Sequence, residues 1–365
     1  MLIQHRQKIC NVMNRLIPLF LAFFVGAIFA VIIGYNPFEV YGLIIKGGFG
    51  SFSNWMMTLG FACPIIMTGI ATAFSFKAGV WNIGIEGQLY IGAYAAALVG
   101  GGYYGIASLG LPAYIHIPLA LLSGALCATI FAIIPALLKA LLNVNVVVST
   151  MMLNYIAIGL TNFMCKAFHQ GNQSYDSTYP VMDTAIIPKI DPRFRVTWAI
   201  ILAIVIVFVI AFILKRTKFG YEINAIGRQL EFSEATGMRV KKKIILLFLV
   251  SGVIAGLAGA SEVLGVNKNF TPGFSGDPGL GWEGYFVAVL AENNPIAVLI
   301  IAIIFGGFRF GSISAQSKIG MPLDLLNIIK STMILFYAVR YMKPDAKIFH
   351  LFGSDNGRML KGKGK

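Results

Sequence analysis

The chain has 365 residues, of which 57% are hydrophobic and only 12% are charged. Soluble domains carry roughly 25% charged residues, so this composition excludes an ordinary soluble protein and predicts an all-α polytopic membrane protein. The formal net charge of +14 does not indicate nucleic-acid binding, because the basic residues lie in short segments beside apolar runs, where they set membrane topology. The four cysteines are scattered without metal-binding spacing, so we interpret them as small core residues.

A helix that spans a bilayer core needs about 20 residues. Segments close to that length are residues 16–34, 55–74, 115–138, 146–163, 196–214, 244–264 and 323–339. We interpret the first as an uncleaved helix because it is long enough to span and follows basic residues. Shorter apolar segments cover residues 85–101, 283–291 and 296–308. The last two would not cross the bilayer without their flanks, and counting them separately gives ten segments.

Basic residues identify the cytoplasmic side. They dominate the N-terminus, the loop 215–243 and the tail 340–365, whereas the loop 166–195 balances three acids against four bases. A count of ten membrane segments places both termini and the basic loop on the cytoplasmic side. A count of nine would place the basic tail outside. We therefore predict a single transmembrane domain over residues 1–365, with a cytoplasmic loop at 215–243 and a basic cytoplasmic tail at 340–365.

Two segments are interrupted by polar residues and glycine, 74–88 in the first half and 281–295 in the second. Broken backbone inside lipid must be packed in protein or line a cavity. Paired interruptions in corresponding halves indicate a transport pathway. The alternative for the first interruption is a simple turn of the chain at the cytoplasmic surface. The sequence leaves both interpretations open.

Ionisable residues in or beside apolar segments are costly and should face the protein interior or the interface. They are Glu86, Glu262, Glu283, Glu292, Asp324 and Lys330. Glu262 and Glu283 lie near segment ends, so Glu86 and Glu292 are the stronger functional candidates. A buried carboxylate there either contacts substrate or accepts hydrogen bonds from a helix N-terminus and stabilises the broken helix. Asp324 and Lys330 are six residues apart and are not expected to pair.

Small residues recur every four positions at Gly252, Gly256 and Ala260. This spacing allows close approach of two helices, so we expect the segment 244–264 to be central to packing. The sequence has no P-loop, no His-Glu-x-x-His and no Gly-x-Ser-x-Gly pattern. It therefore predicts a protein that is not an enzyme and has no metal site.

The loop 220–243 has apolar residues at roughly helical spacing, and the glycines at 227 and 237 allow turns next to a short helix. Such an amphipathic helix either lies on the membrane surface or docks into a groove on a soluble partner. Its acidic residues favour docking on a partner.

Four stretches together resemble a known family: KAGVWNIGIEGQLYIGA (77–93), GYEINAIGRQLEFSEATGMRVKKKI (220–244), FLVSGVIAGLAGASEVLG (248–265) and GLGWEGYFVAVLAENNP (279–295). They are similar to the transmembrane permeases of bacterial ABC importers, in the simple sugar and nucleoside branch of the superfamily that also imports ribose and branched-chain amino acids. The resemblance covers about residues 55–339. Within the branch, the first interruption and the long N-terminal section suggest a nucleoside permease more than a ribose-type one.

The resemblance implies a multi-pass protein of the bacterial cytoplasmic membrane. It would pair with a second permease, identical or paralogous, with two cytoplasmic ATPase domains that bind ATP and Mg²⁺, and with an external substrate-binding protein. No cofactor is expected on this chain. The two interruptions would flank the pathway, with seven candidate lining residues: Trp81, Asn82, Glu86, Gln88, Glu283, Asn293 and Asn294.

The same resemblance implies that residues 224–238 form the helix that couples the permease to the ATPase. Its candidate residues are Asn224, Gly227, Arg228, Glu231, Glu234, Ala235, Gly237 and Met238. The implied mechanism is alternating access. The alternatives are a sugar permease of the same branch, an ion-coupled transporter in which Glu86 or Glu292 binds the ion, and an intramembrane structural or enzyme subunit.

Overall fold

The computed structural model describes residues 21–169, 171, 176–276 and 279–322, together with scattered positions between 324 and 335. Over these residues the regular structure is helical, apart from an isolated antiparallel bridge between Lys189 and Thr197. In chain order the helices are α2 (Pro37–Phe49), α3 (Phe52–Phe76), α4 (Ile85–Gly100), α5 (Ala113–Leu142), α6 (Val146–Phe168), α7 (Ala199–Arg216), α8 (Lys218–Arg228), α9 (Leu230–Ala235), α10 (Val240–Glu262), α11 (Leu280–Leu290) and α12 (Pro295–Ile319). A π-helical turn, η3 (Val263–Asn267), extends α10.

Six of the described helices are long and apolar enough to cross a membrane: α3, α5, α6, α7, α10 with η3, and α12. A seventh candidate is the pair formed by the helix Leu21–Ile33 and α2, which is bent by 116°. The expected all-α polytopic membrane protein is therefore confirmed. The helices α4 and α11 are shorter, with 16 and 11 residues.

One predicted segment is much shorter than the helix observed there. The segment 296–308 is part of α12, which continues to Ile319 and has 25 residues, enough to span on its own. Hydropathy underestimated its length because Arg309 and several small polar residues end the apolar run. The bend before α2 was not predicted, and most of the segment 323–339 and the whole tail 340–365 lie outside the described residues.

The chain contacts itself in two compact units. One unit consists of Met1–Leu43 and Ser312–Lys365, and within it the Tyr35 hydroxyl donates a hydrogen bond to the Gly320 carbonyl at 3.1 Å. The other unit, Ile44–Gly311, contains both segments that the sequence predicts to be interrupted, although residues 281–290 of the second are helical in α11 and only 291–294 form a turn. The site described below lies within this second unit.

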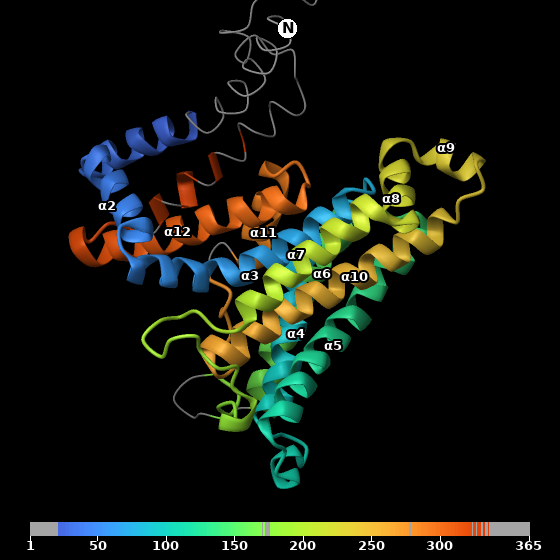
Figure 1. Ribbon diagram of the computed structural model, residues 1–365, viewed down its shortest axis with the longest axis horizontal. Coiled ribbons are helices and arrows are strands. Elements are labelled where there is room, and N and C mark those ends of the chain that lie inside the picture. Colours follow the sequence, from blue (N-terminus) through green and yellow to red (C-terminus); the bar gives the residue numbers. More distant parts are fainter. Residues whose placement is uncertain are drawn as a thin grey trace, which may run out of the picture. The chain divides into compact units, whose positions relative to one another are not determined.

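Within the second unit α3 is the most deeply buried of the spanning helices. Of its apolar 18-residue stretch, 89% is buried, against 28% for the corresponding stretch of α5. The helix α3 packs on α7, α10 and α11, and α10 also packs along α5 and α4 (Figure 1). The exposed face of α5 carries large apolar residues such as Leu122, Leu126 and Ile130. That face is suited to lipid or to another membrane subunit.

The helices α4, α5 and α10 approach each other through glycine. A Cβ atom on Gly92 would lie 2.5 Å from Gly256 Cα, and one on Gly256 would lie 2.5 Å from Gly124 O. A Cβ on Gly124 would be 2.9 Å from Ala260 Cβ, and Gly252 faces α5 at a similarly short distance. The three backbones are therefore in direct contact, which small residues four positions apart in a helix allow.

Candidate functional site

The first interruption lies between α3 and α4, where residues 77–84 leave the helical conformation. Asn82 organises this turn and is fully buried. Its Oδ1 accepts a hydrogen bond from Gly84 N at 3.0 Å, and its Nδ2 donates to Ser251 Oγ on α10 at 3.1 Å. Both polar atoms of this predicted pathway residue are therefore used within the protein.

Two residues of α6 complete the turn. Ile83 N donates to Thr150 Oγ1 at 3.2 Å, and Gly87 N donates to Asn154 Oδ1 at 2.8 Å. Asn154 Nδ2 donates in turn to Ile83 O at 2.9 Å. Sequence reasoning missed both residues, although polar side chains four positions apart in an apolar helix share one face and indicate a polar neighbour.

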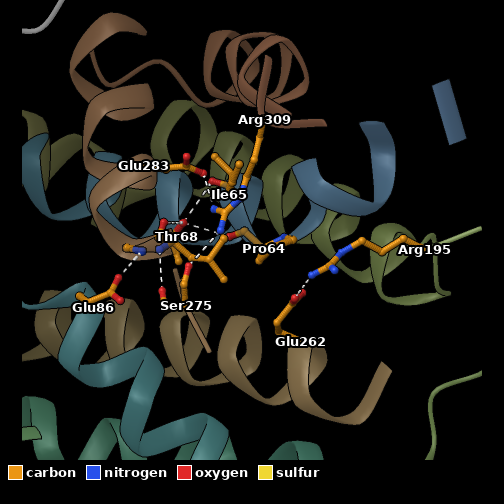
Figure 2. A network of polar contacts seen from close by, with 11 residues as sticks. Pro64, Ile65, Thr68, Glu86, Arg195, Glu262, Ser275, Glu283 and Arg309 are labelled. Carbon is orange, nitrogen blue, oxygen red and sulfur yellow. Dashed lines mark hydrogen bonds and ion pairs between the residues drawn. The ribbon is translucent and has the colours of Figure 1, made fainter. Parts of the chain in front are cut away.

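Glu86, which follows the first interruption, contacts the start of α11 directly. Its side chain is 3% exposed, and its Oε2 accepts a hydrogen bond from Gly281 N in the first turn of α11 at 2.5 Å. Leu280 N donates to Ser275 Oγ at 2.6 Å, and Figure 2 shows Ser275 beside Glu86 at this helix start. The carboxylate and the hydroxyl thus cap the N-terminus of α11, where free N–H groups and the helix dipole favour negative charge.

Glycine makes this contact possible. A Cβ atom on Gly279 would lie 2.1 Å from Glu86 Oε1, and one on Gly281 would lie 2.6 Å from Glu86 N. The pattern G-L-G before Trp282 therefore leaves room for the carboxylate to reach the backbone. Between the two sequence explanations for Glu86, these contacts favour stabilisation of a broken helix.

Glu283 belongs to the same network. Its side chain is 1% exposed and accepts a hydrogen bond from Arg309 Nη1 at 2.9 Å, while Arg309 Nη2 donates to Ser275 O at 3.1 Å. Figure 2 shows Arg309 reaching from α12 to both groups. Sequence reasoning missed Arg309, although a single arginine within an apolar helix is costly unless it is paired.

Of the other carboxylates that the sequence identified, Glu262 forms a separate ion pair with Arg195 (Figure 2), and Glu292 is exposed in the turn after α11. The guanidinium of Arg195 also lies 4.4 Å from the centre of the Phe61 ring. Breaking such a buried pair by removing one partner leaves an uncompensated charge and costs about 3–5 kcal/mol. Glu262 is thus part of the packing between α10 and the segment before α7.

The other predicted lining residues lie in different environments. Gln88 is 1% exposed, and its Oε1 has no hydrogen-bond partner among the described residues. Trp81 is 40% exposed. Asn293 and Asn294 lie in the turn after α11, at the opposite end of that helix from Glu86, and Asn294 Oδ1 accepts a hydrogen bond from Ile296 N at 3.1 Å. The structure therefore brings Glu86 and Glu283 together and leaves the two asparagines apart from them.

The predicted coupling helix is two helices, α8 and α9, separated at Gln229. Asn224 lies in α8 and donates a hydrogen bond from Nδ2 to Gly220 O at 2.8 Å. Gly227 lies within α8, and Gly237 has a turn conformation with φ +80°. Arg228 ends α8. The exposed residues of α9 and its flank include Glu231, Glu234, Ala235 and Gly237, and Met238 is half-buried.

Gly227 is where α8 meets the first interruption. A Cβ atom on Gly227 would lie 2.0 Å from Lys77 O, so the two backbones touch. The helices α8 and α9 also expose large side chains: Tyr221 is 70% exposed, Leu230 42% and Phe232 62%. Such a set of exposed apolar residues beside charged ones is typical of a docking surface for a protein partner.

The arrangement defines a multi-pass membrane protein whose two broken segments meet through a buried carboxylate, which is the architecture of a transporter subunit. The family described as "Branched-chain amino acid transport system / permease component" matches residues 54–338. Because this match covers most of the chain, the protein belongs to that permease family and is a multi-pass protein of the cell membrane.

Curated relatives are similar along most of the chain. The guanosine ABC transporter permease protein NupP of Bacillus subtilis is 32% identical over 93% of this chain and 98% of NupP. NupQ, a guanosine ABC transporter permease protein of the same organism, is 31% identical over 76% of this chain and 86% of NupQ. The glucose ABC transporter permease protein TsgB13 of Haloferax volcanii is 27% identical over 86% and 83%. No solved structure matches the chain.

Proposed function

We propose that this chain is the permease subunit of an ATP-driven importer that translocates nucleosides, with guanosine-like purine nucleosides as its preferred class. The observation that carries the proposal is the similarity to NupP over nearly the whole of both chains. The match to TsgB13 favours a second candidate, a simple sugar such as glucose. Sugar and nucleoside share the hydroxyls of a sugar ring, so the base is what separates the two candidates.

The proposal includes the topology and the partners. Ten membrane segments form a single permease domain over residues 1–365, and both termini lie on the cytoplasmic side. The ATPase subunits bind ATP and Mg²⁺, and an external binding protein delivers the substrate. The second permease is a paralogue rather than a second copy, because two different guanosine permease proteins of Bacillus subtilis both match this chain.

The mechanism proposed is alternating access driven from α8 and α9. The ATPase docks on their exposed residues, and its closure moves α8. Since Gly227 touches the backbone of Lys77, this displacement reaches the first interruption. Glu86 then transmits this displacement to α11, because its carboxylate accepts the hydrogen bond from Gly281 N. Asn82, Glu86 and Glu283 act as positioning residues in this mechanism, while Trp81, Gln88 and the asparagines at 293 and 294 remain the candidate lining.

The test is uptake of radiolabelled guanosine, ribose and glucose in cells that lack this chain and in cells where it is restored. Each measurement is repeated with the partner ATPase made inactive for hydrolysis. We expect guanosine uptake to return only with this chain and an active ATPase. Return of glucose or ribose uptake alone would establish the sugar alternative. Uptake that persists with the inactive ATPase and requires an ion gradient would establish an ion-coupled transporter.

A further inference from the structure

Aromatic side chains from the two interrupted segments form one cluster in the second unit. Phe76, the last residue of α3, lies 4.7 Å from Trp81 and 5.8 Å from Tyr285, measured between ring centres. Tyr285 in turn lies 6.2 Å from Trp282 and 5.7 Å from Phe286. We call these five residues the aromatic cluster. Sequence analysis identified only Trp81 among them as a lining residue.

The indole of Trp81 is both exposed and well supported. Its exposed fraction is 40%, whereas Phe76 behind it is only 7% exposed. The neighbouring residue Asn82 is fixed by hydrogen bonds to Gly84 and Ser251. A flat side chain that is held in place in this way loses little conformational freedom when it binds a ligand.

The chemistry of such a surface favours a flat ligand. Aromatic side chains bind nucleobases by stacking, which tolerates different bases because every base has a π face. A sugar alone offers hydroxyls, and the amide of Asn82 next to Trp81 and the carboxylate of Glu283 next to Trp282 already hydrogen-bond within the protein. The ring of Trp81 is therefore better suited to the base of a nucleoside than to its sugar.

Building on the proposed nucleoside import, we propose that Trp81, backed by Phe76 and flanked by Tyr285, is a stacking platform for the base of the substrate. The cluster consists of residues from the end of α3, from the turn that α8 touches and from α11, the helix that Glu86 caps. Movement of either interruption changes the separation of Trp81 and Tyr285, which come from different segments. The platform is thus placed to hold the base in one state of the transport cycle and release it in the other.

The experiment measures initial rates of guanosine uptake against concentration in cells that contain the complete transporter. Trp81→Leu keeps an apolar side chain and removes the ring, and Trp81→Phe retains a smaller ring. Trp198→Leu is the matched control, because Trp198 is 56% exposed at the start of α7 and lies outside the aromatic cluster. We expect Trp81→Leu to raise KM for guanosine about tenfold, Trp81→Phe to raise it much less, and the control to leave it unchanged.

The outcomes separate this inference from the proposed function. Wild-type protein that imports no nucleoside overturns the proposed function and the platform with it. Wild-type guanosine uptake with an unaltered KM in Trp81→Leu overturns the platform alone. Reduced amounts of both Trp81 variants in the membrane, with unchanged KM, would show that the indole serves as an interfacial anchor in lipid. A second pair, Tyr285→Leu and Tyr285→Phe, repeats the test from α11, where only loss of the ring should raise KM.

Discussion

At position 86 a carboxylate with 3% exposure meets the backbone N–H of Gly281, which is 195 residues away in the sequence. The start of a helix carries about half a positive charge, and in a low-dielectric interior this attraction is much stronger than in water. An unpaired N–H group in the same place would have no water to replace the lost acceptor. The local chemistry of Glu86 therefore stabilises the structure, whatever its distance from the substrate.

Replacement of Glu86 tests this role. Glu86→Ala leaves Gly281 N without its acceptor and should destabilise the protein by about 1–3 kcal/mol. Glu86→Gln keeps an acceptor oxygen and loses only the charge, so its effect should be smaller. The measurement is the midpoint of heat-induced loss of the monodisperse peak in detergent. Glu39→Ala, at an exposed position in α2, is the control. A wild-type midpoint for Glu86→Ala would contradict the cap.

The helix α8 contains a glycine whose place is explained by a tertiary contact and not by the sequence of the helix. Glycine is a poor helix former, yet Gly227 lies within the last turn of α8. The reason is its contact with Lys77 O, which leaves no space for a side chain. A sequence alone does not separate these uses of glycine, because glycine indicates both chain reversal and close backbone approach, and only the tertiary neighbours decide between them.

Gly227→Ala should therefore separate α8 from the first interruption without unfolding the helix, because alanine favours helix. We expect uptake to fall at least tenfold while the amount of protein in the membrane stays close to wild type. Gly159→Ala in α6 is the matched control, since nothing lies within 4 Å of a Cβ at that position. Both variants are measured by transport and by quantitative immunoblotting of membranes.

Equal uptake in the two variants would show that the contact between Gly227 and Lys77 carries no part of the coupling. Loss of Gly227→Ala from the membrane would point to a folding role instead. Measuring ATP hydrolysis in the same membranes adds a sharper readout. Separation of α8 from the interruption should leave hydrolysis active and disconnect it from transport.

For the whole molecule, the proposed topology makes a direct prediction. Green fluorescent protein fused after residue 365 should fluoresce, because it folds in the cytoplasm. A single cysteine introduced at Ser108, in the loop between α4 and α5, should react with an impermeant maleimide in intact cells, whereas one at Thr236 should react only after the membrane is opened. Both positions are exposed. A reactive Thr236 cysteine in intact cells would contradict the assignment of the basic loop to the cytoplasm.

Composition and apolar run lengths predicted the polytopic helical class, because the bilayer requires long apolar helices with satisfied backbone. Most spanning helices begin and end within a few residues of the predicted ranges. The polar contacts were harder to predict. Arg195 and Arg309 are far in sequence from Glu262 and Glu283, and a single sequence carries no signal for which charges meet. Thr150 and Asn154 are neutral, so they are less costly within an apolar helix than charges and give a weaker signal of a polar neighbour.

The contact of Gly92, Gly124 and Gly256 limits where the protein can deform. Side chains between helices act as an adjustable layer, since they change rotamer when helices slide past each other. Where three backbones touch there is no such layer, and any sliding produces collisions between peptide groups. The helices α4, α5 and α10 should thus travel as one rigid block, so the hinge of the transport cycle must be located outside them.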